Sequence, residues 1–287
     1  MLKLGGSITN RTKPPVFDFR KIRNLIGWWD FSVKHQSHVR QSDGSMVTND
    51  SKIWTVRNLA FNLEKNNTRK EKALGKFLTS AGAGNRPTWF SADGGYAQFT
   101  SSESDRMFVG ATSSGAVDTN QLSSSSISQD GYTLFIVCKN DSSSLSSGEY
   151  IFAMFGEVEQ ANQLVLASST VHGWKLDGME PPKSETNVNT GESVDNSKIL
   201  LTLHKNSTDS NEMYLNGRKN VGTTSGASGD HVMDMSQNSG DTHVFLGGTG
   251  NNFTWNGRIY ETVIFNRALN AREVKKIEMF LLKKHNI

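Results

Sequence analysis

The chain has 287 residues, of which 35% are hydrophobic and 21% are charged, and its formal net charge is +3. No apolar run approaches the roughly 18 to 20 residues that a helix needs to cross a bilayer, which argues against a membrane-spanning protein. One cysteine excludes an intrachain disulfide, and 26 glycines against 5 prolines are typical of a turn-rich β protein.

Charge is distributed unevenly along the chain. Residues 1–24 carry a net charge of +5, and residues 25–287 carry a net charge of −2. This pattern predicts a basic N-terminal arm, and on charge grounds it excludes the rest of the chain as a nucleic-acid binder. The arm is either a solvated tail or a segment that docks onto a partner. No apolar h-region follows Met1, so no signal peptide is expected.

Short aromatic or apolar runs bounded by glycine, serine and asparagine predict a series of strands. The Asp-Gly-Gly run at 93–95 and the Asn-Gly pair at 216–217 are turn signals. The polar stretches 110–131 and 178–197 are predicted loops, and the charged stretch 62–76 is a predicted exposed insertion. The predicted strands cover residues 25–31, 52–56, 87–90, 96–99, 132–138, 149–156, 163–168, 171–177, 199–204, 212–216, 243–247 and 258–265.

The C-terminal part of the chain predicts a strand followed by the one clear helix. Strand 258–265 alternates in polarity, which predicts that Ile259, Glu261, Val263 and Phe265 share one face. Beyond it, Asn270 and a glutamate three residues later form a capping-box pattern. Many short strands with one terminal helix predict an all-β, antiparallel jelly-roll sandwich. The apolar stripe of the helix consists of Val274, Ile277, Phe280 and Leu281.

Two stretches of the sequence resemble a known family. Residues 255–281 read W-N-G-R-I-Y-E-T-V-I-F-N-R-A-L-N-A-R-E-V-K-K-I-E-M-F-L and follow M-Y-L-N-G at 213–217. They resemble the end of a laminin-G-like domain of the concanavalin A-like lectin and glucanase superfamily. Three earlier stretches of this chain resemble the front half of that domain. They are G-W-W-D-F-S at 27–32, N-R-P-T-W at 85–89 and G-G-Y-A-Q-F at 94–99.

This resemblance implies a two-part organisation and a class of function. A basic arm spans residues 1–24, and one laminin-G-like jelly-roll domain spans residues 25–287. Members of the family mostly bind glycans or proteins, and a fold by itself does not settle which. After the strand at 96–99, relatives often continue with an acidic Asp-Gly-x-x-Asp run, whereas this chain has Thr-Ser-Ser-Glu-Ser-Asp at 100–105.

Catalysis of glycan hydrolysis would require two carboxylates that flank the scissile bond. Glucanases of the superfamily carry Glu-x-Asp-x-x-Glu on one strand. Glu103 and Asp105 begin this pattern, but Phe108 occupies the third acidic position. Glu157 and Glu159 fail in the same way. The sequence therefore predicts a non-enzymatic protein with no catalytic residues, and glycan hydrolysis is only a third alternative.

The sequence assigns no metal ligands and predicts no cofactor. His35 and His38 form the one close histidine pair but lack the glutamate of a zinc-protease helix. Cys138 lies in the most apolar strand and is predicted to be an inert core residue. The resemblance implies calcium at one rim of the sandwich, but turn-forming residues have the same sequence signature. The loop candidates are Asp43, Asn49, Asp50, Asp209, Asn211, Asp230 and Asp234.

Sugar binding would use exposed aromatic side chains that stack on a sugar ring. Trp174 and Trp255 are the candidates for glycan binding, and core packing is the alternative for each.

The opening M-L-K-L-G-G-S at 1–7 also resembles the start of laminin-G-like proteins of tailed phages.

We therefore expect a structural protein on the surface of a tailed-phage virion, as capsid decoration or as a tail-associated protein, made in the host cytoplasm. Its expected partners are other virion proteins of the capsid or tail lattice and a cell-surface glycan, without nucleic acid or membrane insertion. The alternative is a carbohydrate-binding adhesin or receptor-binding tail component. The expected assembly interface consists of Leu2, Leu4, Arg11, Lys13, Phe17, Phe19 and Arg20.

Overall fold

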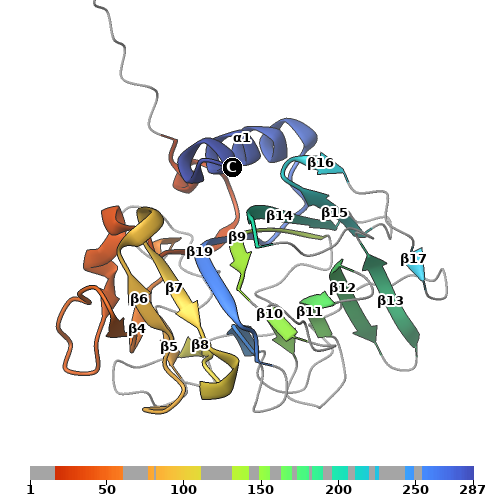
Figure 1. The fold of residues 1–287 in the computed structure, drawn as a ribbon. Coiled ribbons are helices and arrows are strands. Elements are labelled where there is room, and N and C mark those ends of the chain that lie inside the picture. Colours follow the sequence, from red (N-terminus) through yellow and green to blue (C-terminus); the bar gives the residue numbers. More distant parts are fainter. Residues whose placement is uncertain are drawn as a thin grey trace, which may run out of the picture.

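Two antiparallel β-sheets face each other, and one α-helix lies across the outer face of one sheet (Figure 1). This arrangement confirms the predicted all-β sandwich with a short C-terminal helix. Among the described residues, no helix is long and apolar enough to cross a membrane. The structure, a computed structural model, describes residues 17–60, 77–80, 82–110, 131–141, 149–155, 163–169, 173–180, 183–189, 196–205, 211–219, 224–225, 243–248 and 254–287.

The sheet that carries the helix, here the helix-side sheet, is organised around β19 (Gly257–Phe265). Strand β9 (Tyr132–Asn140) pairs along one side of β19. Strands β1 (Leu25–Asp30) and β7 (Tyr96–Phe99) lie end to end along the other side, β7 opposite residues 257–259 and β1 opposite 261–265. The remaining strands are β14 (Lys198–Lys205), β15 (Asn211–Leu215) and β16 (Arg218–Lys219) beyond β9, and β6 (Thr88–Phe90) and β3 (Ser51–Lys52) beyond β7.

The second sheet ends in the short edge strand β2. The predicted loop at 178–197 is wrong in part, because residues 183–189 form a strand of this sheet that pairs with the strand before it. Its polar sequence lacks the apolar alternation by which strands are recognised. In order, the strands are β17 (Thr224–Ser225), β13 (Lys183–Asn189), β12 (Gly173–Glu180), β11 (Gln163–Ser169), β10 (Glu149–Phe155), β18 (His243–Leu246), β8 (Met107–Gly110), β5 (Phe77–Ser80), β4 (Thr55–Arg57) and β2 (Val39–Arg40).

The chain changes sheets at residues 53–54. The sequence predicts one strand over 52–56, whereas the structure has β3 in the helix-side sheet and β4 in the second sheet. Ile53 is fully buried between the sheets, and Trp54 is half-buried at the beginning of β4. Residues 51–57 therefore contribute a strand to each sheet, and the crossing places Trp54 near the edge of the second sheet.

Apolar side chains form two cores. The core between the sheets contains Trp29, Trp89 and Trp255, each fully buried. The second core lies between the helix-side sheet and helix α1 (Ala271–His285). The capping box is confirmed, since Asn270 Oδ1 accepts from the Glu273 N–H at 3.0 Å and Glu273 Oε2 accepts from the Asn270 N–H at 3.1 Å. The helix buries Val274, Ile277 and Leu281 in the second core and half-buries Phe280.

A β-bulge in β19 corrects the predicted alternation of this strand. The register shifts between Ile259 and Glu261 as β19 runs along β9. Ile259 lies in the core between the sheets, whereas Tyr260 lies in the second core and Glu261 contacts residues of helix α1. An extra residue in one strand sends two consecutive side chains to the same side. The bulge therefore places a carboxylate beneath the helix.

The end of the predicted arm belongs to the folded unit. Phe19, in the 3-10 turn η1 (Phe19–Lys21), is fully buried, with ring centroids 5.0 Å from Trp28 and 5.5 Å from Phe280. Phe17 stacks on Phe280 at 4.8 Å. In Figure 1 this segment lies against one end of helix α1. The other 3-10 turns are η2 (Val33–His38), η4 (Ala92–Gly94) and η5 (Ser101–Glu103).

Candidate functional site

Strands β2, β4 and β5 form the edge of the second sheet and send alternate side chains to opposite faces. Val39, Val56 and Leu78 stand opposite one another and are fully buried in the core. Their sequence neighbours therefore point to the outer face. These outward residues are His38, Arg40, Thr55, Arg57 and Phe77.

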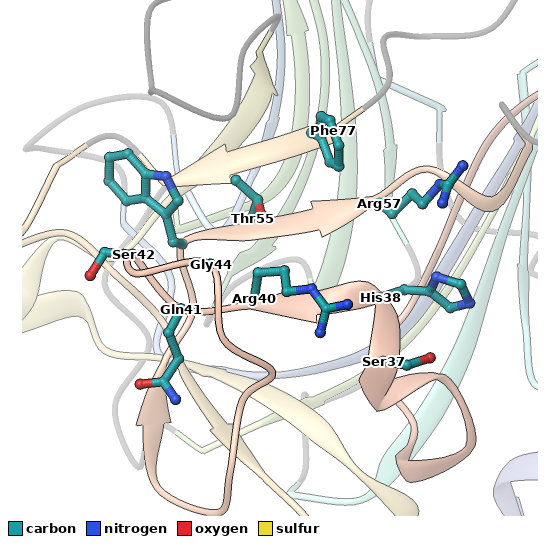
Figure 2. A pocket seen from close by; sticks show the side chains of 10 residues that line it. Ser37, His38, Arg40, Gln41, Ser42, Gly44, Thr55, Arg57 and Phe77 are labelled. Atoms are coloured by element: carbon teal, nitrogen blue, oxygen red, sulfur yellow. The ribbon is translucent and has the colours of Figure 1, made fainter.

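The outward residues form the floor of a surface cavity of about 280 Å³, here called the edge pocket (Figure 2). The walls are formed by Trp54 and by the turn that follows β2, which contributes Gln41, Ser42 and Gly44. The Ser45 N–H donates to Asp43 Oδ1 at 2.8 Å, which fixes this turn. Ligand pockets range over roughly 300–1,000 Å³, so the edge pocket, just below this range, suits a single small ring.

Trp54 is held in a defined orientation at the pocket wall. Its backbone N–H donates to the Arg40 carbonyl at 2.7 Å. The Arg86 guanidinium lies over the indole ring, 4.4 Å from its centroid. A cation placed over an aromatic face stabilises that arrangement by about 0.5–2 kcal/mol. The ring is therefore positioned before any ligand arrives.

The edge pocket is polar and carries positive charge. Arg40 and Arg57 come from neighbouring strands, and Figure 2 shows His38 close to Arg57. Within the described part of the chain, Arg40 forms no ion pair, and no carboxylate lines the pocket. Burial, together with the charges of His35, Arg57 and Arg40, holds the pKa of His38 below its ordinary value.

His35 connects the edge pocket to a second group of charged residues. Its ring stacks on His38 with centroids 5.8 Å apart, and its Nε2 lies 3.5 Å from Asp30 Oδ2. Burial holds the pKa of His35 below its ordinary value, and Lys284 adds to this effect while Asp30 opposes it. This second group lies where helix α1 meets the helix-side sheet and is here called the buried charge cluster; it consists of Trp28, Asp30, Glu261, Lys284 and His285.

The buried charge cluster is internally satisfied. Lys284 Nζ lies 2.5 Å from Asp30 Oδ2 and 2.7 Å from Glu261 Oε2. Trp28 Nε1 donates to Glu261 Oε1 at 2.8 Å, and His285 Nε2 lies 2.8 Å from Oε2. Burial favours the neutral form of Glu261, but Lys284 and His285 outweigh it and hold its pKa far below the ordinary value. The cluster fastens helix α1 to the helix-side sheet.

The predicted glycan-binding tryptophans lie elsewhere. Trp255 is fully buried, with its ring 6.3 Å from that of Phe99, so its core-packing alternative holds and the ring cannot stack on a sugar. Trp174 lies in β12 opposite Ser168, and its side chain lies outside the described residues.

The predicted assembly interface is only partly described, because Leu2, Leu4, Arg11 and Lys13 lie outside the described residues. Phe19 is buried within the chain and offers no surface to a partner. Phe17 is half-buried on the helix, and Arg20 pairs with Asp18 at 2.7 Å.

The predicted calcium candidates do not gather where the structure describes them. Asp43 caps its own turn, and Asn49 Oδ1 accepts from the Ser91 N–H at 2.9 Å. Among the described residues, no three His, Cys, Asp or Glu side chains form a metal-binding group. Asp209, Asp230 and Asp234 lie outside those residues, as does the side chain of Asn211.

The two acids of the incomplete glucanase pattern also separate. Glu103 is exposed and pairs with Lys52 at 2.5 Å. Asp105 is fully buried, and burial raises its pKa to about 6. Cys138 is fully buried as predicted, and burial raises the pKa of its thiol.

Comparison with known proteins concerns the fold alone. No family model and no curated protein matches the chain. The NanB sialidase from Streptococcus pneumoniae is 14% identical over 53% of this chain with a TM-score of 0.42, and the match covers 24% of that protein, about a quarter of its length. The CBM40 domain of the Ruminococcus gnavus IT-sialidase, bound to α2,3-sialyllactose, is 14% identical with a TM-score of 0.40, over 52% of this chain and 82% of that one.

A similar degree of likeness holds for domain 4 of AbnA, a GH43 extracellular arabinanase from Geobacillus stearothermophilus in complex with arabinotriose. It is 12% identical, with a TM-score of 0.46, over 89% of this chain and 98% of that one. At such identities and scores, these likenesses carry no argument about what this chain binds.

Proposed function

We propose that this chain is a glycan-binding β-sandwich, that the edge pocket is its sugar site, and that it acts by binding rather than by catalysis. One observation carries the proposal. A surface cavity of about 280 Å³ at a sheet edge combines two aromatic side chains, Trp54 and Phe77, with hydroxyl, amide and guanidinium groups.

This mixture of groups suits a sugar. A sugar ring has an apolar C–H face and a rim of hydroxyl groups, so it needs an aromatic surface and hydrogen-bonding groups in one place. Trp54 supplies a positioned ring, and the hydroxyls of Ser42 and Thr55 lie at the same wall and floor. Gln41 Nε2 donates to the Met46 carbonyl at 3.3 Å, which orients its amide. Ordering these groups before binding lowers the entropic cost of complex formation.

The distribution of carboxylates supports binding over hydrolysis. A glycosidase needs two carboxyl groups roughly 5–10 Å apart beside the scissile bond. Among the described residues, none of those lining the edge pocket is acidic. Asp30 and Glu261, which do lie together, are buried beneath helix α1 and are bridged by Lys284. A buried, bridged pair of this kind holds the structure and offers no access to a polysaccharide.

The test is a glycan array with the full chain, followed by calorimetric titration of the glycans retained. The Trp54→Ala variant is expected to bind about tenfold more weakly, because it loses the apolar area buried against the ring and about 0.5–1.5 kcal/mol of aromatic contact. Tyr214→Ala, which removes a half-buried aromatic side chain from the far edge of the helix-side sheet, is the matched control and is expected to bind normally.

Unchanged binding in a folded Trp54→Ala variant would remove the edge pocket as the site. Retention of no glycan on the array would refute glycan binding itself.

The virion role expected from the N-terminal residues stays a separate prediction. Phe17 and Phe19 fix the place on helix α1 from which the arm departs, which is compatible with docking by residues 1–16. Mass spectrometry of purified particles from the source tests it. Stoichiometric copies of this chain would support a structural role in the particle, and its absence from particles would refute that role.

A further inference from the structure

Arg40 brings to the edge pocket a positive charge that no acid among the described residues neutralises. Arg40 and Arg57 stand on neighbouring strands, and His38 lies beside both. Within the described residues, Arg40 forms no ion pair. The nearest acid along the chain, Asp43, is exposed on the turn and accepts the Ser45 N–H at 2.8 Å. A ligand with a negative charge would therefore complete the pocket, since guanidinium groups recognise carboxylate and sulfate oxygens by charge-assisted hydrogen bonds.

His38 is the titratable group of this pocket. The charged or titratable groups that act on it are His35 from η2, Arg40 from β2, Arg57 from β4 and Asp30 from the buried charge cluster. Three of these four disfavour a proton on His38, and partial burial disfavours it further. In the empty pocket the imidazole is therefore neutral near neutral pH. An anion seated beside it would reverse this balance.

We propose that the edge pocket selects sugars that carry a carboxylate or sulfate group, and that His38 takes up one proton from solvent when such a sugar binds. The inference rests on the proposed function and adds to it a ligand class and a pH dependence. Because binding consumes one proton, affinity rises as pH falls, by at most about tenfold per pH unit. Neutral sugars lack the charge that draws the proton in, so their affinity stays flat with pH.

The experiment uses matched glycan pairs that differ only in charge. The pairs are tetragalacturonate and its methyl ester, sulfated chondroitin and its desulfated form, and sialyllactose and lactose. Each is titrated calorimetrically into the full chain at pH 7.5, 6.5 and 5.5, in two buffers with different ionisation enthalpies so that proton uptake is counted. The first and third pairs report on carboxylate recognition, and the second pair reports on sulfate.

Three variants separate the roles. Arg40→Gln removes the cation that forms no ion pair among the described residues, and it is expected to weaken binding of the charged member about tenfold at every pH. His38→Asn keeps a polar side chain but cannot titrate, so affinity is expected to become independent of pH. Arg218→Gln removes an exposed cation from the edge strand β16 of the helix-side sheet and is the control for general electrostatic attraction.

For the unaltered chain we expect at least tenfold preference for the charged member of one or more pairs. We also expect at least a threefold gain in affinity from pH 7.5 to 5.5. Equal binding of neutral partners, still abolished by Trp54→Ala, would overturn this inference and leave the proposed function intact. Charged binding that ignores pH, or that Arg218→Gln weakens as much as Arg40→Gln does, would also overturn it. Failure of every glycan to bind would remove both.

Discussion

The buried charge cluster and the edge pocket are connected through His35 and His38, but their charges are arranged in opposite ways. In the cluster, Glu261 is bonded to three side chains and Lys284 bridges two carboxylates. In the edge pocket, Arg40 is a cation without an ion-pair partner among the described residues. A set of charges that satisfy one another stabilises a fold, whereas an unbalanced set at the surface is available for a ligand. This difference separates the structural cluster from the proposed binding site in one protein.

The largest expected effect comes from breaking the cluster. Glu261→Ala leaves the Lys284 ammonium buried with one carboxylate fewer and removes the acceptor of Trp28 Nε1. Removing one partner of a buried ion pair costs about 3–5 kcal/mol of unfolding free energy. Urea unfolding measures this loss, with Glu103→Gln as the control for an exposed pair that contributes about 0–1 kcal/mol. A loss below about 1 kcal/mol in Glu261→Ala would show that the cluster does not hold the helix.

Asp105 differs from Glu261, because it is a buried carboxyl whose Oδ1 lacks a hydrogen-bond partner among the described residues. Burial raises the pKa of Asp105 to about 6. Its contribution to stability is therefore full below its unfolded pKa of about 3.9 and is lost as pH rises through about 6. Asp105→Asn imitates the protonated acid, so we expect it to stabilise the protein by about 1–2 kcal/mol at pH 7.5 and to change little at pH 4.

Urea unfolding at the two pH values checks this prediction. Destabilisation by Asp105→Asn at pH 7.5 that is absent at pH 4 would contradict it, because the ionised carboxylate would then have a stabilising role in the fold. For Glu261 the sign is opposite. Its pKa is lowered in the folded protein, so its contribution is present above the unfolded pKa of about 4.3 and is lost as pH falls.

The smallest expected effect on stability comes from substitutions in the edge pocket. Arg40→Gln and His38→Asn alter a surface pocket in which few contacts depend on these side chains, so each is expected to change the free energy of unfolding by no more than about 0.5 kcal/mol. Thermal melting in the absence of glycan measures this directly. A loss above about 2 kcal/mol in either variant would mean that the pocket residues hold the sheet edge together and that their arrangement is structural.

Elements with strong local signals were predictable from the sequence. Helix α1 has a capping box and an apolar stripe, and β9 has a nearly continuous apolar run. Strand β13 escaped prediction because its sequence is polar and its stability comes from pairing with β12. The bulge in β19 also escaped, because a register shift depends on the partner strand.

The candidate site was harder to foresee than the fold. No strand was predicted from the sequence at 39–40 or 77–80, where the structure has β2 and β5. Residues 52–56 were also interpreted as one strand, so the outward pair Thr55 and Arg57 was not recognised. The buried charge cluster has no local signal at all, since Lys284 and Asp30 are 254 residues apart in the chain. Side chains separated this widely come together only through the complete packing of both sheets and the helix.

The central position of β19 has a consequence for how this protein is made on the ribosome. Strands β1, β7 and β9 are all synthesised before β19, and within the described residues β1 pairs with β19 alone. Until residues 257–265 have left the exit tunnel, the edges of these strands are unpaired and exposed to other nascent chains. Pairing over more than two hundred residues is also intrinsically slow. The protein therefore reaches its native topology only after its last strand has been translated.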